Sequence, residues 1–426
     1  MMAEAAQRHG SMEESKPLLL RSRPADEESI GAAARGEDAL LRRDWTLFTA
    51  LNFLFAFGFA VYMGVFQNFL REDLHVSPLG LGQLESLREV PGLLAALMAG
   101  TLVALAESRV AGLGLAITAV GIGATGLVDG YGLMVAVTVF WSVGFHLWAS
   151  VQGAITLALS KGEEGGRHLG RMGAVGSVAT LAALGLAWGL AQFAPKVPYS
   201  VYFVGAGACI FAAAVLCVRL STNAAGAPRA RLILRREYGL FYLLTFLEGC
   251  RRQIFGIFAS FVLIAVYKVP LSTMLGLQLA SAVLVALTAP WVGRLIDRRG
   301  ERGPLGFYSV ALVILFVGYA LIPNGTVLCA LFVIDRVLFS FGVGFTTYLN
   351  RIVRPNELTP CLAMGTTMNH IAAVTVPLGG ALLWQGSGNY QLPFGIGVAV
   401  AIVSLFATLR LPHGASSRPA PAEDVR

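Results

Sequence analysis

Charged side chains interrupt an apolar stretch of this 426-residue chain at residues 244–256, LTFLEGCRRQIFG. Glu248 precedes Arg251 and Arg252 by three and four residues, so on a helix its carboxylate can reach either guanidinium group. The surrounding segment, 238–267, is otherwise long and apolar enough to cross a lipid bilayer. A charge in the middle of a bilayer is costly, so these side chains must face protein, water or one another.

Two other apolar segments carry charges of the same kind. Glu85, Arg88 and Glu89 lie in one of them, and Asp335 and Arg336 lie in the other. Together with the group around Glu248 they make four carboxylates and four guanidinium groups, whose charges sum to zero.

Two interpretations of this charged set are open. In the first, Arg251 or Arg252 binds an anionic group of a substrate, because a planar guanidinium group can donate two hydrogen bonds to a carboxylate or a phosphate. Glu89, Glu248 or Asp335 would then be the proton carrier. In the second, the eight groups only neutralise one another, and breaking the set destabilises the protein whatever the substrate.

Further polar side chains lie in two other apolar segments. His146 and Gln152 occur in one, and Asn369 and His370 in the other. A histidine titrates near neutral pH and could relay a proton. It could equally form a hydrogen bond with a backbone carbonyl group between helices, so both roles stay open.

The composition identifies an integral membrane protein with many spans. Hydrophobic residues make up 56% of the chain and charged residues only 13%, and the mean hydropathy is +0.68. The five cysteines show neither a CxxC spacing nor a histidine partner, so we expect no disulfide framework and no metal centre built on them. The net charge of +7 is explained by arginines in loops, and a nucleic-acid partner is not expected.

Twelve apolar segments follow one another from Thr46 onward, each near or above the length that a bilayer span requires. The predicted spans are 46–69, 79–104, 110–128, 131–159, 169–193, 198–218, 238–267, 271–295, 305–322, 326–349, 360–384 and 392–411. The sequence therefore predicts an all-α membrane protein with twelve transmembrane helices.

The loops between these spans differ in charge on the two sides of the membrane. With alternating loops assigned to alternate sides, 25 Lys and Arg residues fall on one side and three on the other, Arg71, Lys196 and Lys268. Because basic loops stay in the cytoplasm, both termini are predicted to be cytoplasmic. The membrane would be the cell (inner) membrane in a bacterium. In a eukaryote an endolysosomal membrane is the alternative, since residues 14–19 (ESKPLL) fit an acidic dileucine sorting pattern.

The longest internal break, 219–237, is basic and contains Ala-Ala-Gly-Ala-Pro, which predicts a flexible linker. Segments 159–188 and 353–384 are also alike, with an acid in the loop, a Met-Gly pair among small residues and a closing tryptophan. Internal repetition of this kind is common in transporters. The predicted organisation is a disordered cytoplasmic tail (1–45), a six-helix half (46–218), a cytoplasmic linker (219–237), a second six-helix half (238–411) and a cytoplasmic tail (412–426).

The loop sequence GRLIDRRGER at 293–302 resembles the signature GxxxD(R/K)xGxR of the major facilitator superfamily. The resemblance implies that Asp297, Arg298 and Arg302 tie helix ends together and act in the conformational gate. In the corresponding loop of the first half, Ala104 stands where the signature has its acid, and Glu107 and Arg109 are the nearest charged residues. This first copy of the signature is degraded.

Two motifs of individual branches of that family are incomplete. Gln152-Gly153 is present in the fourth span, but Ala149 stands where proton-coupled members have an arginine. The fifth span contains Gly170, Gly173 and Gly176 but lacks the Gly-Pro pair of drug antiporters, which argues against a multidrug exporter. The sequences ESLRE (85–89), RRQIF (251–255) and MNH (368–370) resemble a loosely described prokaryotic branch with no substrate attached to it.

The family resemblance implies two pseudo-symmetric halves and a secondary transporter that moves a small organic solute by alternating access. The arginines favour an anionic solute, and proton coupling is an open prospect. The sequence shows no GxxxxGK[ST] loop, no metal-ligand cluster and no nucleophile with a base at a recognisable spacing. We therefore expect no enzyme activity, no cofactor and a monomer whose partners are the bilayer, a small molecule and protons. The alternative from another class is a non-transporting receptor or assembly scaffold of the same fold.

Overall fold

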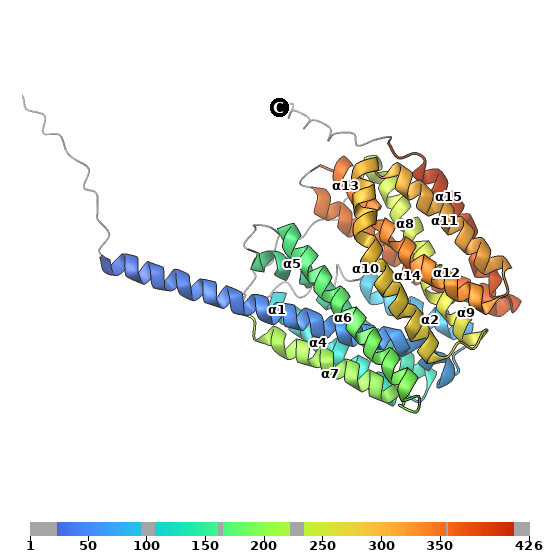
Figure 1. The fold of residues 1–426 in the computed structure, drawn as a ribbon, viewed down its shortest axis with the longest axis horizontal. Helices are drawn as coiled ribbons and strands as arrows, with labels where there is room; N and C mark the ends of the chain where they lie inside the picture. The colour runs from blue at the N-terminus through green and yellow to red at the C-terminus, as the bar shows by residue number, and fades with distance from the viewer. Residues whose placement is uncertain (1–23, 95–106, 161–164, 222–233, 355–356, 413–426) are drawn as a thin grey trace, which may run out of the picture. The chain divides into compact units, whose positions relative to one another are not determined.

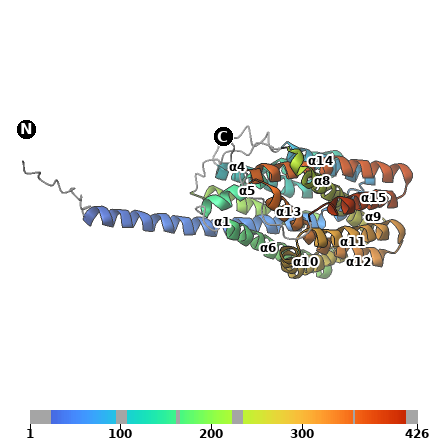
Figure 2. The same ribbon diagram turned by 90° about the horizontal axis from the view of Figure 1, so that it is seen from above.

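The computed structural model describes residues 24–94, 107–160, 165–221, 234–354 and 357–412. The chain separates into two compact units, 1–43 and 44–426. Regular structure in the described residues is helical (Figure 1 and Figure 2). The helices are α1 (Pro24–Glu72), α2 (Pro78–Leu93), α4 (Glu107–Ala124), α5 (Tyr131–Leu159), α6 (Gly165–Phe193), α7 (Tyr199–Val218), α8 (Gly239–Gln253), α9 (Ser260–Ala265), α10 (Leu271–Arg299), α11 (Arg302–Leu321), α12 (Gly325–Leu338), α13 (Val343–Ile352), α14 (Leu358–Ser387) and α15 (Gln391–Thr408).

Nine helical segments in the described part of the chain are long and apolar enough to cross a membrane. The other three predicted spans correspond to α2, to α8 with α9, and to α14. Polar residues reduce the hydropathy of α8 and α14, and the second predicted span continues into 95–106, beyond the described residues. The predicted all-α membrane fold is confirmed.

Helix α1 begins at Pro24, well before the predicted start of the first span at Thr46. Proline is favoured in the first turn of a helix, and the following residues are rich in alanine, glutamate, leucine and arginine, which are strong helix formers. The first helix therefore extends beyond its apolar segment. Residues 24–45 of the tail predicted to be disordered are thus helical. The first 23 residues of that tail, with the dileucine pattern, lie outside the described residues.

The helix contacts in unit 44–426 repeat between its first part, which contains α2 to α7, and its second part, which contains α8 to α15. Helix α4 packs against α7 as α11 packs against α15, so the third and sixth spans correspond to the ninth and twelfth. Between the parts, α2 packs against α14 and α6 against α10. These pairs join the second span to the eleventh and the fifth to the eighth, and exchanging the two parts converts one pair into the other.

Two central spans are interrupted next to their charged residues. In the seventh span, α8 passes into a π-helical turn, Ile254–Ala259, directly after Arg252 and Gln253. In the tenth span, α12 passes into a 3₁₀ turn, Phe339–Gly342, three residues after Arg336. Such irregular turns are frequent at functional sites, because they change the direction in which neighbouring side chains point.

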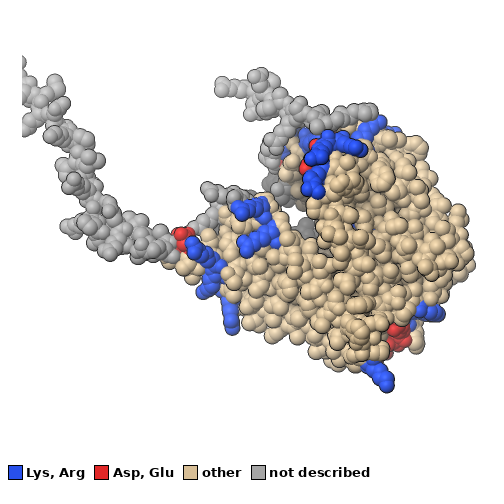
Figure 3. Space-filling view, in the orientation of Figure 1, with Lys and Arg blue, Asp and Glu red and all other residues tan. Residues whose placement is uncertain are grey.

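Charged side chains gather towards the ends of the helices in the space-filling view, and uncharged side chains cover the band between them (Figure 3). This distribution fits a protein whose flank faces lipid. We call the end that carries Arg171, Arg219, Arg299 and Arg351 the basic end. The surface there is indented between groups of Lys and Arg side chains (Figure 3).

Contacts between the first and second parts lie towards the opposite end. The side-chain amide of Gln278 donates to the carbonyl oxygen of Gly64 at 3.1 Å, and the backbone N–H of Leu378 donates to the hydroxyl of Ser86 at 3.1 Å. Gly82 approaches α14 so closely that a Cβ atom on it would lie 2.2 Å from the Cβ atom of Ala381. The structure is therefore tightly joined at the end remote from the basic loops.

We predict that Gly82→Val opens this junction, because its side chain cannot fit against α14. The measurement is the labelling rate of a cysteine placed at Met63, which lines the central cavity described below, by a membrane-impermeant maleimide added at the non-basic end. We expect this rate to rise several-fold. Gly379→Val is the matched control, since nothing lies within 4 Å of a Cβ atom there. Equal labelling of both variants would show that the contact does not close this end.

Candidate functional site

A central cavity of about 470 Å³ lies between the two parts of unit 44–426. It adjoins a cavity of about 380 Å³, with which it shares Gln67, Glu85 and Arg336, and one of about 270 Å³, with which it shares Arg252 and Asn369. The polar and charged residues that line the central cavity are Gln67, Glu85, Arg88, Glu89, Ser142, His146, Arg252, Gln253, Arg336, Thr366, Asn369 and His370. The cavity thus brings together seven of the eleven residues predicted for substrate binding or coupling.

Arg88 lies between two acids of its own helix. Its guanidinium group is 2.7 Å from Glu85 and 2.9 Å from Glu89. Glu85 is buried, whereas Glu89 and Arg88 remain partly open to the cavity. This cluster of α2 carries one net negative charge.

Arg251 is enclosed by a second cluster, formed by three spans. Its guanidinium group is 2.8 Å from Asp335 of α12 and 3.1 Å from Glu248 of α8. Its Nε–H also donates to the hydroxyl of Tyr308 of α11 at 2.9 Å, and that hydroxyl donates to Glu248 at 2.6 Å. Arg251 and Asp335 are buried and absent from the lining of the central cavity. Mutual neutralisation therefore accounts for Arg251.

Arg252 and Arg336 differ from Arg251 in having no carboxylate partner. Both line the central cavity. Arg252 stacks on the ring of Phe339 at 5.4 Å and Arg336 on the ring of Phe332 at 5.1 Å. Among the residues that the structure describes, neither guanidinium group forms an ion pair or a hydrogen bond. The hydrogen-bond donors of both remain available to a solute.

Glu89, His146 and His370 meet at the wall of the central cavity. Nδ1 of His370 lies 3.2 Å from Oε2 of Glu89, and this contact joins α14 to α2. Nδ1 of His146 lies 2.8 Å from the carbonyl oxygen of Ser142, one turn earlier on α5. The two imidazole rings are 5.2 Å apart between centroids. The carbonyl that His146 contacts belongs to its own helix and not to a neighbouring one, and a proton relay through His146 stays a prediction.

The two predicted amides have different surroundings. Asn369 lines the central cavity. Gln152 instead donates a hydrogen bond to Asn52, which ties α5 to α1. Gln152 does not line the central cavity.

The predicted gate residues lie at the basic end. Asp297 and Arg298 end α10, and Arg302 begins α11, where it donates to the carbonyl oxygen of Leu411 at 3.2 Å. Glu107 and Arg109 lie in the first turn of α4. These residues are outside the central cavity.

Two other acids at this end were not predicted from the sequence. Glu301 pairs with Arg351 at 2.9 Å and so connects α11 to α13. Glu357 accepts from Arg235 at 2.6 Å and from the Tyr238 hydroxyl at 2.7 Å, and the Tyr238 hydrogen bond, followed by the charge of Arg235, lowers the pKa of Glu357. Glu301 occupies a variable position of the loop signature, so the signature gave no reason to select it.

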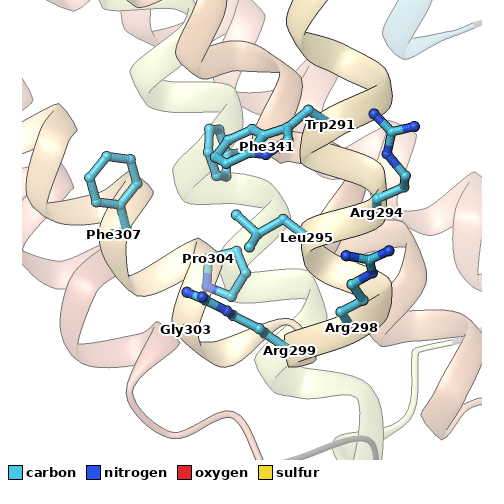
Figure 4. A pocket seen from close by; sticks show the side chains of 9 residues that line it. All are labelled: Trp291, Arg294, Leu295, Arg298, Arg299, Gly303, Pro304, Phe307 and Phe341. Carbon is cyan, nitrogen blue, oxygen red and sulfur yellow. The ribbon is translucent and has the colours of Figure 1, made fainter.

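A peripheral pocket of about 560 Å³ adjoins the loop 293–302, which contains Asp297, Arg298 and Arg302 (Figure 4). Arg294 and Arg298 extend along one side of α10, while Arg299 extends towards Gly303 and Pro304 (Figure 4). The pocket shares no lining residue with the central cavity.

A family model described as Major Facilitator Superfamily matches residues 48–353. The chain belongs to the major facilitator superfamily. The predicted family membership is confirmed, and so are a secondary transporter and a non-enzymatic fold. The branch is not determined, and the resemblance to a prokaryotic branch stays a prediction.

Solved structures of this family share the fold. A nucleoside transporter, NupG, aligns with a TM-score of 0.70 at 13% sequence identity, over 86% of this chain and 98% of that one. A bacterial homologue of the iron transporter ferroportin, in an inward-facing state, aligns with a TM-score of 0.70 at 15% identity, over 87% and 98%. A bacterial homologue of the human lysosomal transporter Spinster, inward-facing and occupied, aligns with a TM-score of 0.67 at 16% identity, over 91% and 99%. No curated protein sequence matches the chain.

We predict that the neighbouring arginines of this transporter differ in their effect on stability. Arg251→Ala leaves the buried Asp335 and the part-buried Glu248 without their cation, which costs about 3–5 kcal/mol of unfolding free energy. Arg252→Ala removes a side chain that faces the cavity and should leave the unfolding temperature nearly unchanged. The measurement is thermal unfolding of both purified variants in detergent. Equal destabilisation by the two substitutions would contradict the separation of the two roles.

Proposed function

We propose that this secondary transporter carries a small organic anion, bound between Arg252 and Arg336 in the central cavity. The observation that carries the proposal is the pair of cavity-lining guanidinium groups that have no acid partner among the described residues. A guanidinium group can hold a carboxylate or a phosphate by two hydrogen bonds, which gives geometric selectivity as well as affinity. The cavity volume of about 470 Å³ lies in the range of small-molecule sites.

The charge balance supports an anionic solute. The Arg88 cluster and the Arg251 cluster each carry one net negative charge, while Arg252 and Arg336 are the positive groups that remain. A bound carboxylate or phosphate would therefore meet the uncompensated cations of the cavity. The phenylalanine rings beneath both guanidinium groups hold these groups in position and leave their N–H hydrogen-bond donors unoccupied.

Glu89 is the proposed proton carrier, with His370 as its partner. Glu89 and His370 line the same cavity as the two arginines, and their contact joins the two halves of the transporter. Protonation of Glu89 would weaken its attraction to Arg88 and to a protonated His370, so proton binding and the separation of the halves would be coupled. Ala149 at the family's arginine position leaves this pair as the better candidate.

The proposed domain organisation is two six-helix halves, 46–218 and 238–411, that rock about the cavity, with 219–237 as the linker. If the basic loops are cytoplasmic, the junction at Gly82 and Ala381 is the closed outer end and the conformation is inward-facing. The maleimide labelling described for Gly82→Val, with reagent supplied from each side in turn, tests that orientation. The cargo named for the solved relatives includes nucleosides and iron, and an identity of 13–16% does not select between such solutes.

We predict that an anionic solute stabilises the wild-type protein and that Arg252→Ala and Arg336→Ala each abolish this effect. The experiment is a thermal-shift panel of mono- and dicarboxylates, sugar phosphates, nucleotides and uncharged analogues. Ligand at 100 times its dissociation constant should add about 2.7 kcal/mol of stability. Arg294→Ala, in the peripheral pocket, is the matched control and should retain the shift. A response only to uncharged solutes would refute the anion site. The absence of any response, with no uptake into proteoliposomes, would favour a scaffold.

We further predict that Glu89→Gln abolishes accumulation of that solute driven by a pH gradient but preserves solute exchange at equilibrium. Glutamine keeps the shape of the side chain but cannot bind and release the proton. The measurement is uptake into proteoliposomes with and without an imposed pH gradient. Glu248→Gln, in the Arg251 cluster, is the comparison variant. Loss of gradient-driven uptake in that variant alone would move the proton carrier to the second half.

A further inference from the structure

Glu89, His146 and His370 offer a carboxylate oxygen and two imidazole nitrogens that lie within 4.8 Å of one another. The three residues come from α2, α5 and α14. A Zn²⁺ ion binds imidazole nitrogen and carboxylate oxygen at about 2.0–2.2 Å, which places neighbouring ligand atoms roughly 3.3 Å apart. The separation of 3.2 Å between His370 Nδ1 and Glu89 Oε2 already has this value.

Hydrogen bonds orient two of these ligand groups. A carbonyl oxygen only accepts, so the contact of His146 Nδ1 with the Ser142 carbonyl places the hydrogen on Nδ1 and leaves the lone pair of Nε2 available. A backbone carbonyl at the second ring nitrogen is a frequent arrangement for histidines that bind metal ions. Arg88 holds the other oxygen of Glu89, Oε1, at 2.9 Å and so fixes the direction of Oε2.

Gly92, one turn after Glu89, makes room for both imidazole rings. A Cβ atom on Gly92 would lie 2.4 Å from Nε2 of His146 and 2.6 Å from Nδ1 of His370. The two nitrogens therefore converge on one small space beside α2. Any residue other than glycine would fill that space.

The charges around this space decide which ions fit. Arg88 is neutralised by Glu85 and Glu89, while Arg252 and Arg336 on the C-terminal side of the same cavity oppose any cation. In a site with two neutral imidazoles and one carboxylate, most of the binding free energy of a cation comes from directed metal–nitrogen bonds and little comes from charge. Late first-row ions such as Zn²⁺ suit it, whereas Mg²⁺ and Ca²⁺ prefer sites made of oxygen.

We propose that Glu89, His146 and His370 bind a divalent transition-metal ion, and that the bound ion joins the two halves of the transporter. Glu89 and His146 belong to the first half and His370 to the second, so the ion would bridge α2 and α5 to α14. Metal binding needs no assumption about the solute. The joining effect rests on the proposed rocking of the halves, because an ion held by both halves favours the conformation that brings its ligands together.

The first test is titration of the purified, metal-free full chain with ZnCl₂ by calorimetry at neutral pH. We expect one saturable site, with a dissociation constant raised at least about tenfold in His146→Ala and in His370→Ala. His168→Ala is the matched control, because His168 stacks on Trp45 and lies outside the cluster. Absence of saturable binding, or equal binding in all three variants, would overturn the proposal.

Two further measurements keep the result interpretable if a histidine variant folds poorly. X-ray absorption of the zinc-loaded wild-type protein should show two imidazole ligands, and the absence of imidazole scattering would overturn the site.

Gly92→Ala retains all three ligands but fills the space between the nitrogens. We expect it to lose zinc binding while its thermal unfolding without zinc shows that it is folded. Unchanged zinc binding in folded Gly92→Ala would show that the ion does not sit there.

The joining effect has a separate readout. In proteoliposomes, Zn²⁺ should inhibit uptake of the anion identified by thermal shift, and a chelator should restore it, with no inhibition in Gly92→Ala. Zinc binding without inhibition would retain the metal site and refute the bridge. Accumulation of radioactive zinc in the liposomes would also refute the bridge, because the ion would then be cargo. Failure of every anion to bind would leave the calorimetric result unaffected, so the two proposals can fail independently.

Discussion

The burial of Arg251 is the constraint on which the second half of the molecule depends. A guanidinium group enclosed within a membrane-spanning bundle has no water to solvate it, so its donors must meet acids or hydroxyls. Here Glu248, Asp335 and Tyr308 supply them, and they come from three different spans. One charge thereby fixes the relative positions of α8, α11 and α12. The cluster around Arg88 is different, since both acids that pair with Arg88 are on α2 and, among the described residues, the guanidinium group itself pairs with no other helix. The carboxylate of Glu89 therefore keeps an oxygen with which to contact His370 across the interface.

Helix geometry separates the roles of two consecutive arginines. Adjacent residues on a helix point about 100° apart, so Arg251 faces into its own half while Arg252 faces the cavity. The spacing of Glu248 allowed an ion pair with either of them. Asp335 decides between them, because it lies on the side that Arg251 faces and adds a second acid there. The same logic applies three spans later, where Asp335 is enclosed and its neighbour Arg336 lines the cavity.

Segment length and hydropathy predicted the helical class and the set of charged residues within the spans, because both report directly on the bilayer. The resemblance of the loop 293–302 to a known signature predicted the family. The sequence did not predict which members of the charged set meet. The contact of Glu89 with His370 spans 281 residues, and it depends on how α2 and α14 are rotated about their axes. Spacing within one helix carries no information about that rotation. Gly92 was overlooked for the same reason, since a glycine in an apolar segment shows its purpose only when the two imidazole rings are placed against it. The early start of α1 was missed because hydropathy marks the part of a helix inside the bilayer and not where the helix begins.

The contacts between the halves differ in whether proton or metal binding can change their free energy during the transport cycle. The hydrogen bonds of Ser86 and Gly64 with the second half are neutral, so neither pH nor metal ions change them near neutrality. The contact of Glu89 with His370 joins the same two halves through groups that bind protons and metal ions. An alternating-access cycle that separates α2 from α14 must break it. Whatever binds to this pair therefore changes the free-energy difference between the two conformations by its differential affinity for them. Arg252 and Arg336 line the same cavity as Glu89 and His370. An anion bound to the two arginines would therefore alter the electric field at Glu89 and His370. Through this field, solute binding and ion binding can be coupled.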